Sequence, residues 1–204
     1  EYDPDNYKIV VLYGDGGNND YGTAVVGTIS GTSMSFGSEA VYSGTSVSAD
    51  ADIAYDTANN KFFIFYDEAS GGVRGLIGTV SGTSISFGSE STISSANVTH
   101  TDVAYDASAG KALVVYRDTG NSHYPTLQAL DNSFALTNFT TESYIGITRG
   151  VALPGVSGTK VSFESSTMGS EQIGAAYDTN AGKIVLAYQD EGNSYYGTAV
   201  VGTV

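Results

Sequence analysis

Near-identical stretches of sequence recur along this chain, and this repetition constrains the fold more than any other feature. The heptapeptide GTAVVGT stands at Gly22–Thr28 and again at Gly197–Thr203. A lysine opens the most apolar segment of each copy, at positions 8, 61, 111 and 183, with spacings of 53, 50 and 72 residues. A period of about 50 residues that holds four strand-like segments is typical of β-propeller blades. The sequence therefore predicts an all-β fold: a β-propeller of about four repeats, each of four antiparallel strands.

We expect one propeller domain over residues 1–204. Its repeats cover approximately 1–51, 52–101, 102–173 and 174–204, with an insert at 131–157 in the third repeat and a truncated fourth repeat. The first repeat begins inside a strand, and the last one stops after its third strand. We therefore expect the chain to be a piece of a longer repeat array.

The insert in the third repeat is expected to be ordered. Aligning Thr28 with Asp131 and Gly31 with Gly158 gives offsets of 103 and 127 residues, so 24 residues are extra. They are rich in Phe, Tyr and Ile, unlike a floppy linker. Residues Phe134–Ile147 would supply the strand that the fourth repeat lacks and let four blades close within one chain. The alternative is a larger ring that two or more chains complete, each covering the open sheet edge of the other.

Each repeat contains four strand-like segments. The innermost one ends in Ala-Tyr-Asp in the second, third and fourth repeats, and small residues suit the crowded centre of a propeller. The second is an unbroken apolar run, which predicts a strand buried on both faces. A buried helix is the competing interpretation, but β-branched and aromatic residues between turns weigh against it. The fourth alternates polar and apolar residues, as expected for a half-exposed outer strand. The second, third and fourth segments of the first repeat are 8–13, 21–29 and 32–38.

The charge of the chain excludes some classes of partner. Eight Lys and Arg stand against 22 Asp and Glu, which gives a net charge of −14. So acidic a chain repels the phosphate backbone, and we expect no nucleic-acid partner. We expect no membrane partner either, because no basic amphipathic stretch is present. The chain has no cysteine, so neither disulfides nor thiolate metal sites can form.

Two motifs give the chain a resemblance to known repeat proteins. They are YQDEGNSYYGTAVVGTV at 188–204 and GTVSGTSISFGS at 78–89. Both are similar to repeat arrays of extracellular and tail-fibre-like proteins from marine bacteria and their phages. The segment LTNFTTESYIGIT at 136–148 resembles one that follows such arrays. The resemblance implies a β-propeller at the cell surface, outside the cell or on a virion. The Asp-x-Gly-Asn turns have a weaker likeness to the Asp-box of sialidase propellers, but the usual Trp is absent and an Asp-box is a structural turn.

The turn between the second and third segments carries the first set of candidate ligand-binding residues. In three repeats an Asp, an Asn and a Tyr stand together: Asp15, Asn18 and Tyr21; Asp118, Asn121 and Tyr124; Asp190, Asn193 and Tyr196. Side-chain oxygens beside an exposed ring could bind Ca²⁺ or a sugar. The alternative is that Asp and Asn cap backbone amides of the turn while Tyr packs between blades. The second repeat has a shorter turn without the Asn and Tyr, so the blade does not require them.

The second set of candidates precedes the innermost strands and would lie at the propeller axis: Asp50, Asp52, His100 and Asp102. Carboxylates around one channel could hold a cation or act as an acid–base pair on a glycoside. The alternative is that they line a solvated channel mouth or cap strands. Gly174 occupies the Asp52 position of the fourth repeat, so no ring of like residues exists. The two histidines, His100 and His123, have no spacing typical of zinc.

These patterns favour a non-catalytic propeller module that recognises a ligand or serves as a structural spacer. Glycans or cell-surface polymers are the ligands that surface Tyr, Asn and Asp suit best. No cofactor is required, and Ca²⁺ is the one candidate ion. The alternative is a glycoside hydrolase-like propeller with axial carboxylates, but no residue is assigned a catalytic role. Self-association through open sheet edges is a further expectation.

Overall fold

The computed structural model describes residues 1–69, 71–137, 140–145, 161–162, 166–169 and 173–203. Every strand pair in this part of the chain is antiparallel, and its only helices are two single 3₁₀ turns. The all-β prediction is therefore confirmed. None of these residues belongs to a helix with the length and hydropathy that crossing a membrane requires.

The first two repeat units share one strand. Unit 1 contains β1 (Tyr2–Asp3), β2 (Lys8–Asp15), β3 (Tyr21–Ser30) and β4 (Ser33–Phe36), followed by the long β5 (Ala40–Asp56). The start of β5 pairs with β3 of unit 1, and its later part pairs with β6 of unit 2. Unit 2 continues with β6 (Lys61–Glu68), β7 (Val73–Ser81), β8 (Ser84–Phe87) and β9 (Ser91–Ser94). The two units therefore form one continuous hydrogen-bonded sheet.

The insert supplies the missing strand of unit 4. Unit 3 has β10 (Val98–Asp106), β11 (Lys111–Asp118), β12 (Tyr124–Leu130) and the short β13 (Leu136–Thr137) and β15 (Val161–Ser162), both of which pair with β12. Between them in sequence lies β14 (Thr140–Ile145), which pairs with β18 of unit 4. Unit 4 also contains β16 (Gly174–Asp178), β17 (Lys183–Asp190) and β18 (Tyr196–Thr203). The strand expected from Phe134–Ile147 is confirmed in β14.

The apolar runs of the repeats form the second strand of every unit, as expected, namely β2, β6, β11 and β17. The outer strand differs from the prediction because it is split in two. In unit 1, β4 pairs with one end of β3 and the start of β5 pairs with the other. In unit 2, β8 pairs with one end of β7 and β9 pairs with the other end. Two segments, rather than one strand, therefore protect the outer edges of units 1 and 2.

The core consists of three hydrophobic clusters, one between each pair of neighbouring units. The first joins units 1 and 2, the second joins units 2 and 3, and the third joins units 3 and 4. Phe134, at the start of the insert, belongs to the second cluster. Its ring lies edge-on to Phe63 and Phe65, with centroids 5.9 Å apart in both pairs. Stability therefore comes from one sheet packing on the next.

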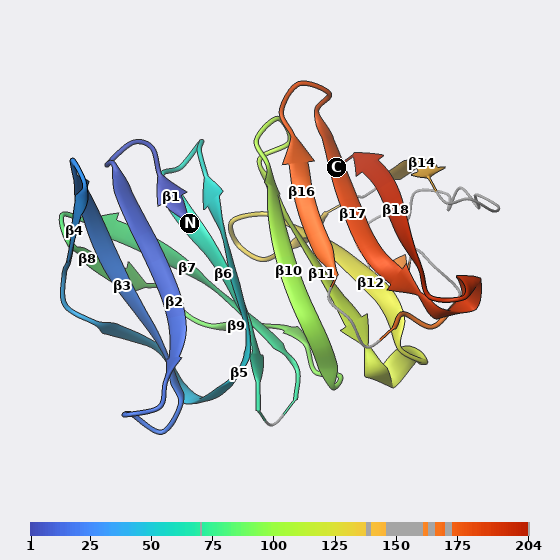
Figure 1. Cartoon of the computed structure of the whole chain (residues 1–204), viewed down its shortest axis with the longest axis horizontal. Helices are drawn as coiled ribbons and strands as arrows, with labels where there is room; N and C mark the ends of the chain where they lie inside the picture. Colours follow the sequence, from blue (N-terminus) through green and yellow to red (C-terminus); the bar gives the residue numbers. More distant parts are fainter. Residues whose placement is uncertain (70, 138–139, 146–160, 163–165, 170–172, 204) are drawn as a thin grey trace.

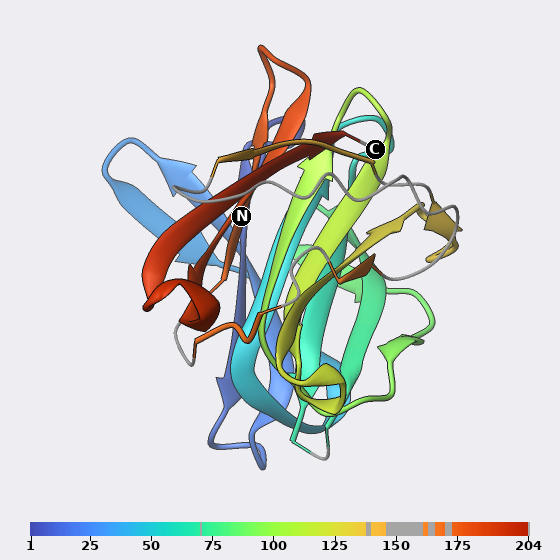
Figure 2. The same cartoon turned by 90° about the vertical axis from the view of Figure 1, so that its right-hand side faces the viewer.

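The four units stand side by side in sequence order, with unit 1 at one end and unit 4 at the other (Figure 1). Figure 2 shows the same molecule from the side of unit 4. Among the described residues, strands of unit 1 do not pack against strands of unit 4 as neighbouring units do. In the described part of the chain the insert completes a sheet and the row of units is open. Closure of four units within one chain stays a prediction.

Candidate functional site

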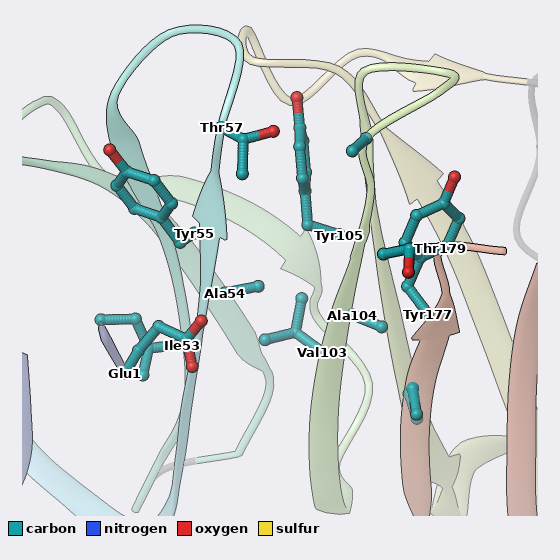
Figure 3. Close-up of a pocket in the computed structure, with 13 residues that line it drawn as sticks. Glu1, Ile53, Ala54, Tyr55, Thr57, Val103, Ala104, Tyr105, Tyr177 and Thr179 are labelled. Atoms are coloured by element: carbon teal, nitrogen blue, oxygen red, sulfur yellow. The ribbon is translucent and has the colours of Figure 1, made fainter. Parts of the chain in front are cut away.

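The first strands of the units line a groove of about 370 Å³ (Figure 3). Because the units repeat, equivalent residues stand side by side along its wall. Tyr55, Tyr105 and Tyr177 form one such row. Ile53, Val103 and Ala175 are the equivalent residues two positions earlier in each strand. Glu1 contributes the only carboxyl among the described lining residues, and burial raises its pKa. The groove is therefore built mainly from aromatic and small apolar side chains.

Asp52 and Asp102, two of the axial candidates, come together and link the units. The Asp52 Oδ2 atom accepts a hydrogen bond from the Val103 backbone N–H of unit 3, at 2.7 Å. Asp102 of unit 3 repeats the contact, since its Oδ2 atom accepts the Ala175 N–H of unit 4. Each carboxylate thereby binds the first strand of the next unit. At the corresponding position of unit 4, Gly174 has no carboxylate to offer.

The Asp102 carboxyl holds its proton unusually tightly. Its pKa is raised to about 8, first by burial and then by a hydrogen bond to Asp52 and the Asp52 charge. The backbone N–H groups of Ala175 and Val103 act in the opposite direction, because they stabilise the ionised form. Two carboxyls in hydrogen-bond contact need one proton between them at neutral pH.

The other two axial candidates, Asp50 and His100, lie at irregularities of the first strands. The pairing of β10 with β11 shifts register between Thr99 and Asp102, and His100 between them has a φ of 59°. The pairing of β5 with β6 shifts in the same way between Val47 and Ala51, where Asp50 lies. The side chain of Asp50 is outside the described part of the structure. These two positions mark β-bulges, which bend the strand just before the residues that line the groove.

The Tyr–Asp doublets that end the first strands have a structural role that the sequence analysis did not assign to them. The Tyr105 hydroxyl donates to Asp56 Oδ1 of the preceding unit, and the Tyr55 hydroxyl donates to Asp5 Oδ2, both at 2.5 Å. Burial and the bond to Asp56 raise the pKa of Tyr105. Asp56 also accepts the backbone N–H groups of Ala58 and Asn59. The recurrence of Tyr-Asp in all four units was the available signal.

Two of the three candidate turn aspartates cap backbone amides. Asp15 Oδ1 accepts the Gly17 N–H at 2.9 Å, and Asp118 Oδ1 accepts the Gly120 N–H at 3.0 Å. Asp118 thereby caps the 3₁₀ turn η1 (Thr119–Asn121). Asp190, before the matching turn η2 (Glu191–Asn193), makes no such cap. Its Oδ1 atom instead accepts the Ser166 hydroxyl at 2.6 Å, so the capping interpretation is wrong for this residue.

The three turns remain three separate places, each at the end of its own sheet. Tyr21 and Tyr124 are half-buried, whereas Tyr196 is 62% exposed and its neighbour Tyr195 is 60% exposed. The exposure of the Asn side chains differs too: Asn18 and Asn193 are half-buried and Asn121 is exposed. Only the turn of unit 4 therefore presents a pair of open aromatic rings.

Within the described ranges, no three His, Asp or Glu side chains lie close enough to hold a metal ion. The chain matches no protein-family model and no curated protein. The chemistry of the groove and of the turns therefore has to be judged from their own geometry.

Proposed function

We propose that the four units are blades of a β-propeller that serves as a non-catalytic recognition module with glycan ligands. The observation that carries this proposal is the pair of exposed tyrosines in the fourth turn, Tyr195 and Tyr196. Exposed aromatic rings stack on the apolar faces of sugar rings, and a neighbouring amide such as that of Asn193 hydrogen-bonds hydroxyl groups. Glycans and cell-surface polymers are the natural ligands for such a surface, outside the cell or on a virion.

The position of the turn also suits recognition. Tyr195 has a φ of 62° and Ser194 has a φ of 55°, so the chain reverses sharply through two residues in the left-handed region. Such a turn holds its side chains on a rigid sheet rather than on a long loop. The tyrosines are therefore already positioned before a ligand arrives, which lowers the entropy cost of binding.

The hydrolase alternative has less support. A retaining glycosidase holds its two carboxyls about 5–5.5 Å apart, and an inverting one roughly 6.5–9.5 Å apart. Asp52 and Asp102 are in hydrogen-bond contact, and each accepts a backbone N–H from the next unit. Such carboxylates are committed to holding the units together.

A glycan array probed with the purified chain, with and without Ca²⁺, tests the proposal. We expect binding to a defined set of glycans and its loss in Tyr196→Ala. Tyr7→Ala is the matched control, because Tyr7 is 73% exposed but lies in a different turn. This variant should bind as the parent does.

Three results would contradict the proposal. The first is an array without any bound glycan, and the second is an equal loss of binding in Tyr196→Ala and Tyr7→Ala. The third is release of reducing sugar from an array glycan that stops in Asp102→Asn, since this would favour the hydrolase.

A further inference from the structure

The strands of unit 1 present an apolar surface on the side that points away from unit 2, which we call the outer face of the first sheet. Strand register places Tyr2 opposite Ile9, Val11 opposite Val25, and Phe36 opposite Gly27, so these side chains share one face. Six of the large exposed apolar side chains in the described part of the chain lie on it: Tyr2, Val11, Ile29, Met34, Phe36 and Val41, each 38–56% exposed. A single sheet face with so many apolar side chains indicates an interaction surface.

The same positions are buried in unit 2. Tyr55, Phe62 and Ile64 are the residues of unit 2 that correspond to Tyr2, Ile9 and Val11. They are 5%, 0% and 0% exposed, because they pack against unit 1 in the first hydrophobic cluster. The outer face of the first sheet is therefore the kind of surface that packs on a preceding unit.

The side of unit 4 that points away from unit 3, which we call the outer face of the fourth sheet, is the complementary half of that interface. Val10, Ala24 and Val26 are the unit 1 residues that pack on unit 2, and they are at most 1% exposed. The same residue types stand in unit 4 at Val185, Ala199 and Val201, all only partly buried. Ala187, which replaces Leu12, is exposed. This face is thus a near copy of a surface that already binds a following unit within the molecule.

We propose that copies of this chain associate head to tail, with the outer face of the first sheet of one copy packed on the outer face of the fourth sheet of another. The internal contact between units 1 and 2 supplies the geometry of this interface. The interface is heterologous, so it closes into a ring when the rotation permits and otherwise extends into a filament. The association does not depend on the proposed glycan binding.

A polar contact would accompany the apolar one. Inside the molecule, a tyrosine of unit 2 and a tyrosine of unit 3 each donate to an aspartate of the preceding unit, as Tyr105 does to Asp56. Across the proposed interface, Tyr2 of one copy corresponds to that tyrosine and Asp178 of the other copy to that aspartate. Asp178 is exposed, whereas Asp56 is 1% exposed. A hydrogen bond from the Tyr2 hydroxyl of one copy to the Asp178 carboxylate of another would therefore be the equivalent contact across the interface.

Sedimentation velocity of the full chain over a dilution series tests the proposal. The parent should show a mass of several chains that falls to one chain on dilution. Val11→Lys alters only the first face and Ala187→Lys only the fourth, and each variant alone should have the mass of one chain. An equimolar mixture of the two variants should form a two-chain complex, because one intact interface remains and cannot extend.

Controls separate association from folding. Val11 and Ala187 are exposed, so both variants should keep the β-sheet circular dichroism and thermal melting of the parent. Ile64→Lys, the same position as Val11 in unit 2, should unfold because Ile64 is 0% exposed. If Val11→Lys does not fold, Phe36→Ser provides a second test of the first face. A parent with the mass of one chain at every concentration would overturn the proposal, as would association of Ala187→Lys alone.

Discussion

At the scale of single residues, the aspartates of this chain serve mainly as acceptors for backbone N–H groups. The four that end the first strands, Asp3, Asp56, Asp106 and Asp178, each accept two backbone N–H groups of the turn that follows. Asp52 and Asp102 accept N–H groups of the next unit. Much of the acidic character of the chain is therefore used to satisfy donors in tight turns and between sheets.

Asp56→Ala should destabilise the protein strongly. It removes the acceptor for Tyr105 and for two backbone N–H groups at a site that is 1% exposed. Each buried donor left without a partner costs about 1–3 kcal/mol. Asp131→Ala is the matched control, because Asp131 accepts two similar turn N–H groups near solvent, and it should cost only about 1 kcal/mol. Urea unfolding measures both, and equal losses of unfolding free energy would contradict the role of the tyrosine contact.

Asp102 should make stability depend on pH. Its folded-state pKa is raised to about 8 from an ordinary value of 3.8, so the folded protein keeps a proton that the unfolded chain releases. The resulting stabilisation is complete below about pH 4 and is lost as the pH rises towards about 8. In Asp102→Asn this contribution is absent. Urea unfolding of both proteins across that range should show the parent losing stability relative to the variant, and parallel pH profiles would refute the assignment.

At the scale of strands, the second strand of each unit is buried according to its place in the row. Phe62–Tyr66 of β6 and Ala112–Tyr116 of β11 are 0% exposed, because sheets cover both of their faces. In β17 only alternate residues are buried, and in β2 only Val10 is buried. Identical sequence patterns therefore have different surroundings at the ends of the row and in its middle.

Val115→Asp should abolish folding, because it places an unpaired charge in a fully buried strand at a cost of several kcal/mol. Ala187→Asp is the matched control, since Ala187 stands at the same position of unit 4 and is exposed. That variant should melt cooperatively, close to the parent. Circular dichroism and thermal melting distinguish the two outcomes, and a folded Val115→Asp would show that β11 is not core.

Removing the insert should weaken unit 4. Deletion of Asp131–Gly150 takes away β14 and leaves the edge of β18 without a hydrogen-bonding partner. We expect a lower melting temperature and aggregation through the freed edge. A Gly/Ser segment of equal length serves as the control for chain length and should not rescue the fold. Unchanged melting of the deletion variant would show that β14 has no stabilising role.

Sequence reasoning identified the second and third strands well, because unbroken apolar runs between turns leave few alternatives. It missed the split outer strands, since the break depends on a contact with the next unit. A Cβ atom on Gly37 would lie 1.8 Å from the Thr83 carbonyl oxygen of unit 2, so only glycine fits there. The hydrogen bond of the Asp190 side chain could not be predicted from local sequence either, because its partner Ser166 lies 24 residues earlier. Repetition reveals local structure, whereas contacts between units depend on the fold.

At the scale of the whole molecule, the described parts of the units form a row (Figure 1). Apolar side chains lie on the outer faces at both ends of this row. The candidate residues of the sequence analysis are distributed over this row. Asp52 and Asp102 meet beside the groove, and the turn residues stay apart at the ends of their sheets. What the sequence could not show is that the two end faces match each other as neighbouring units do inside the chain.

Association between copies should strengthen as the salt concentration rises. The net charge of −14 makes copies repel one another, and salt screens this repulsion while leaving apolar packing in place. Sedimentation at low and at high ionic strength should therefore show a larger mean mass in high salt. Dissociation in high salt would indicate that ion pairs, rather than the sheet faces, hold the copies together.

The strand β5 has a mechanical consequence. Because it belongs to the sheets of both unit 1 and unit 2, no slack loop joins these units that a pulling force could straighten. Tension between them runs along a backbone that is hydrogen-bonded on both sides of the junction, so the two units should yield together rather than one after the other. Under tension along the chain, this junction would act as a rigid joint.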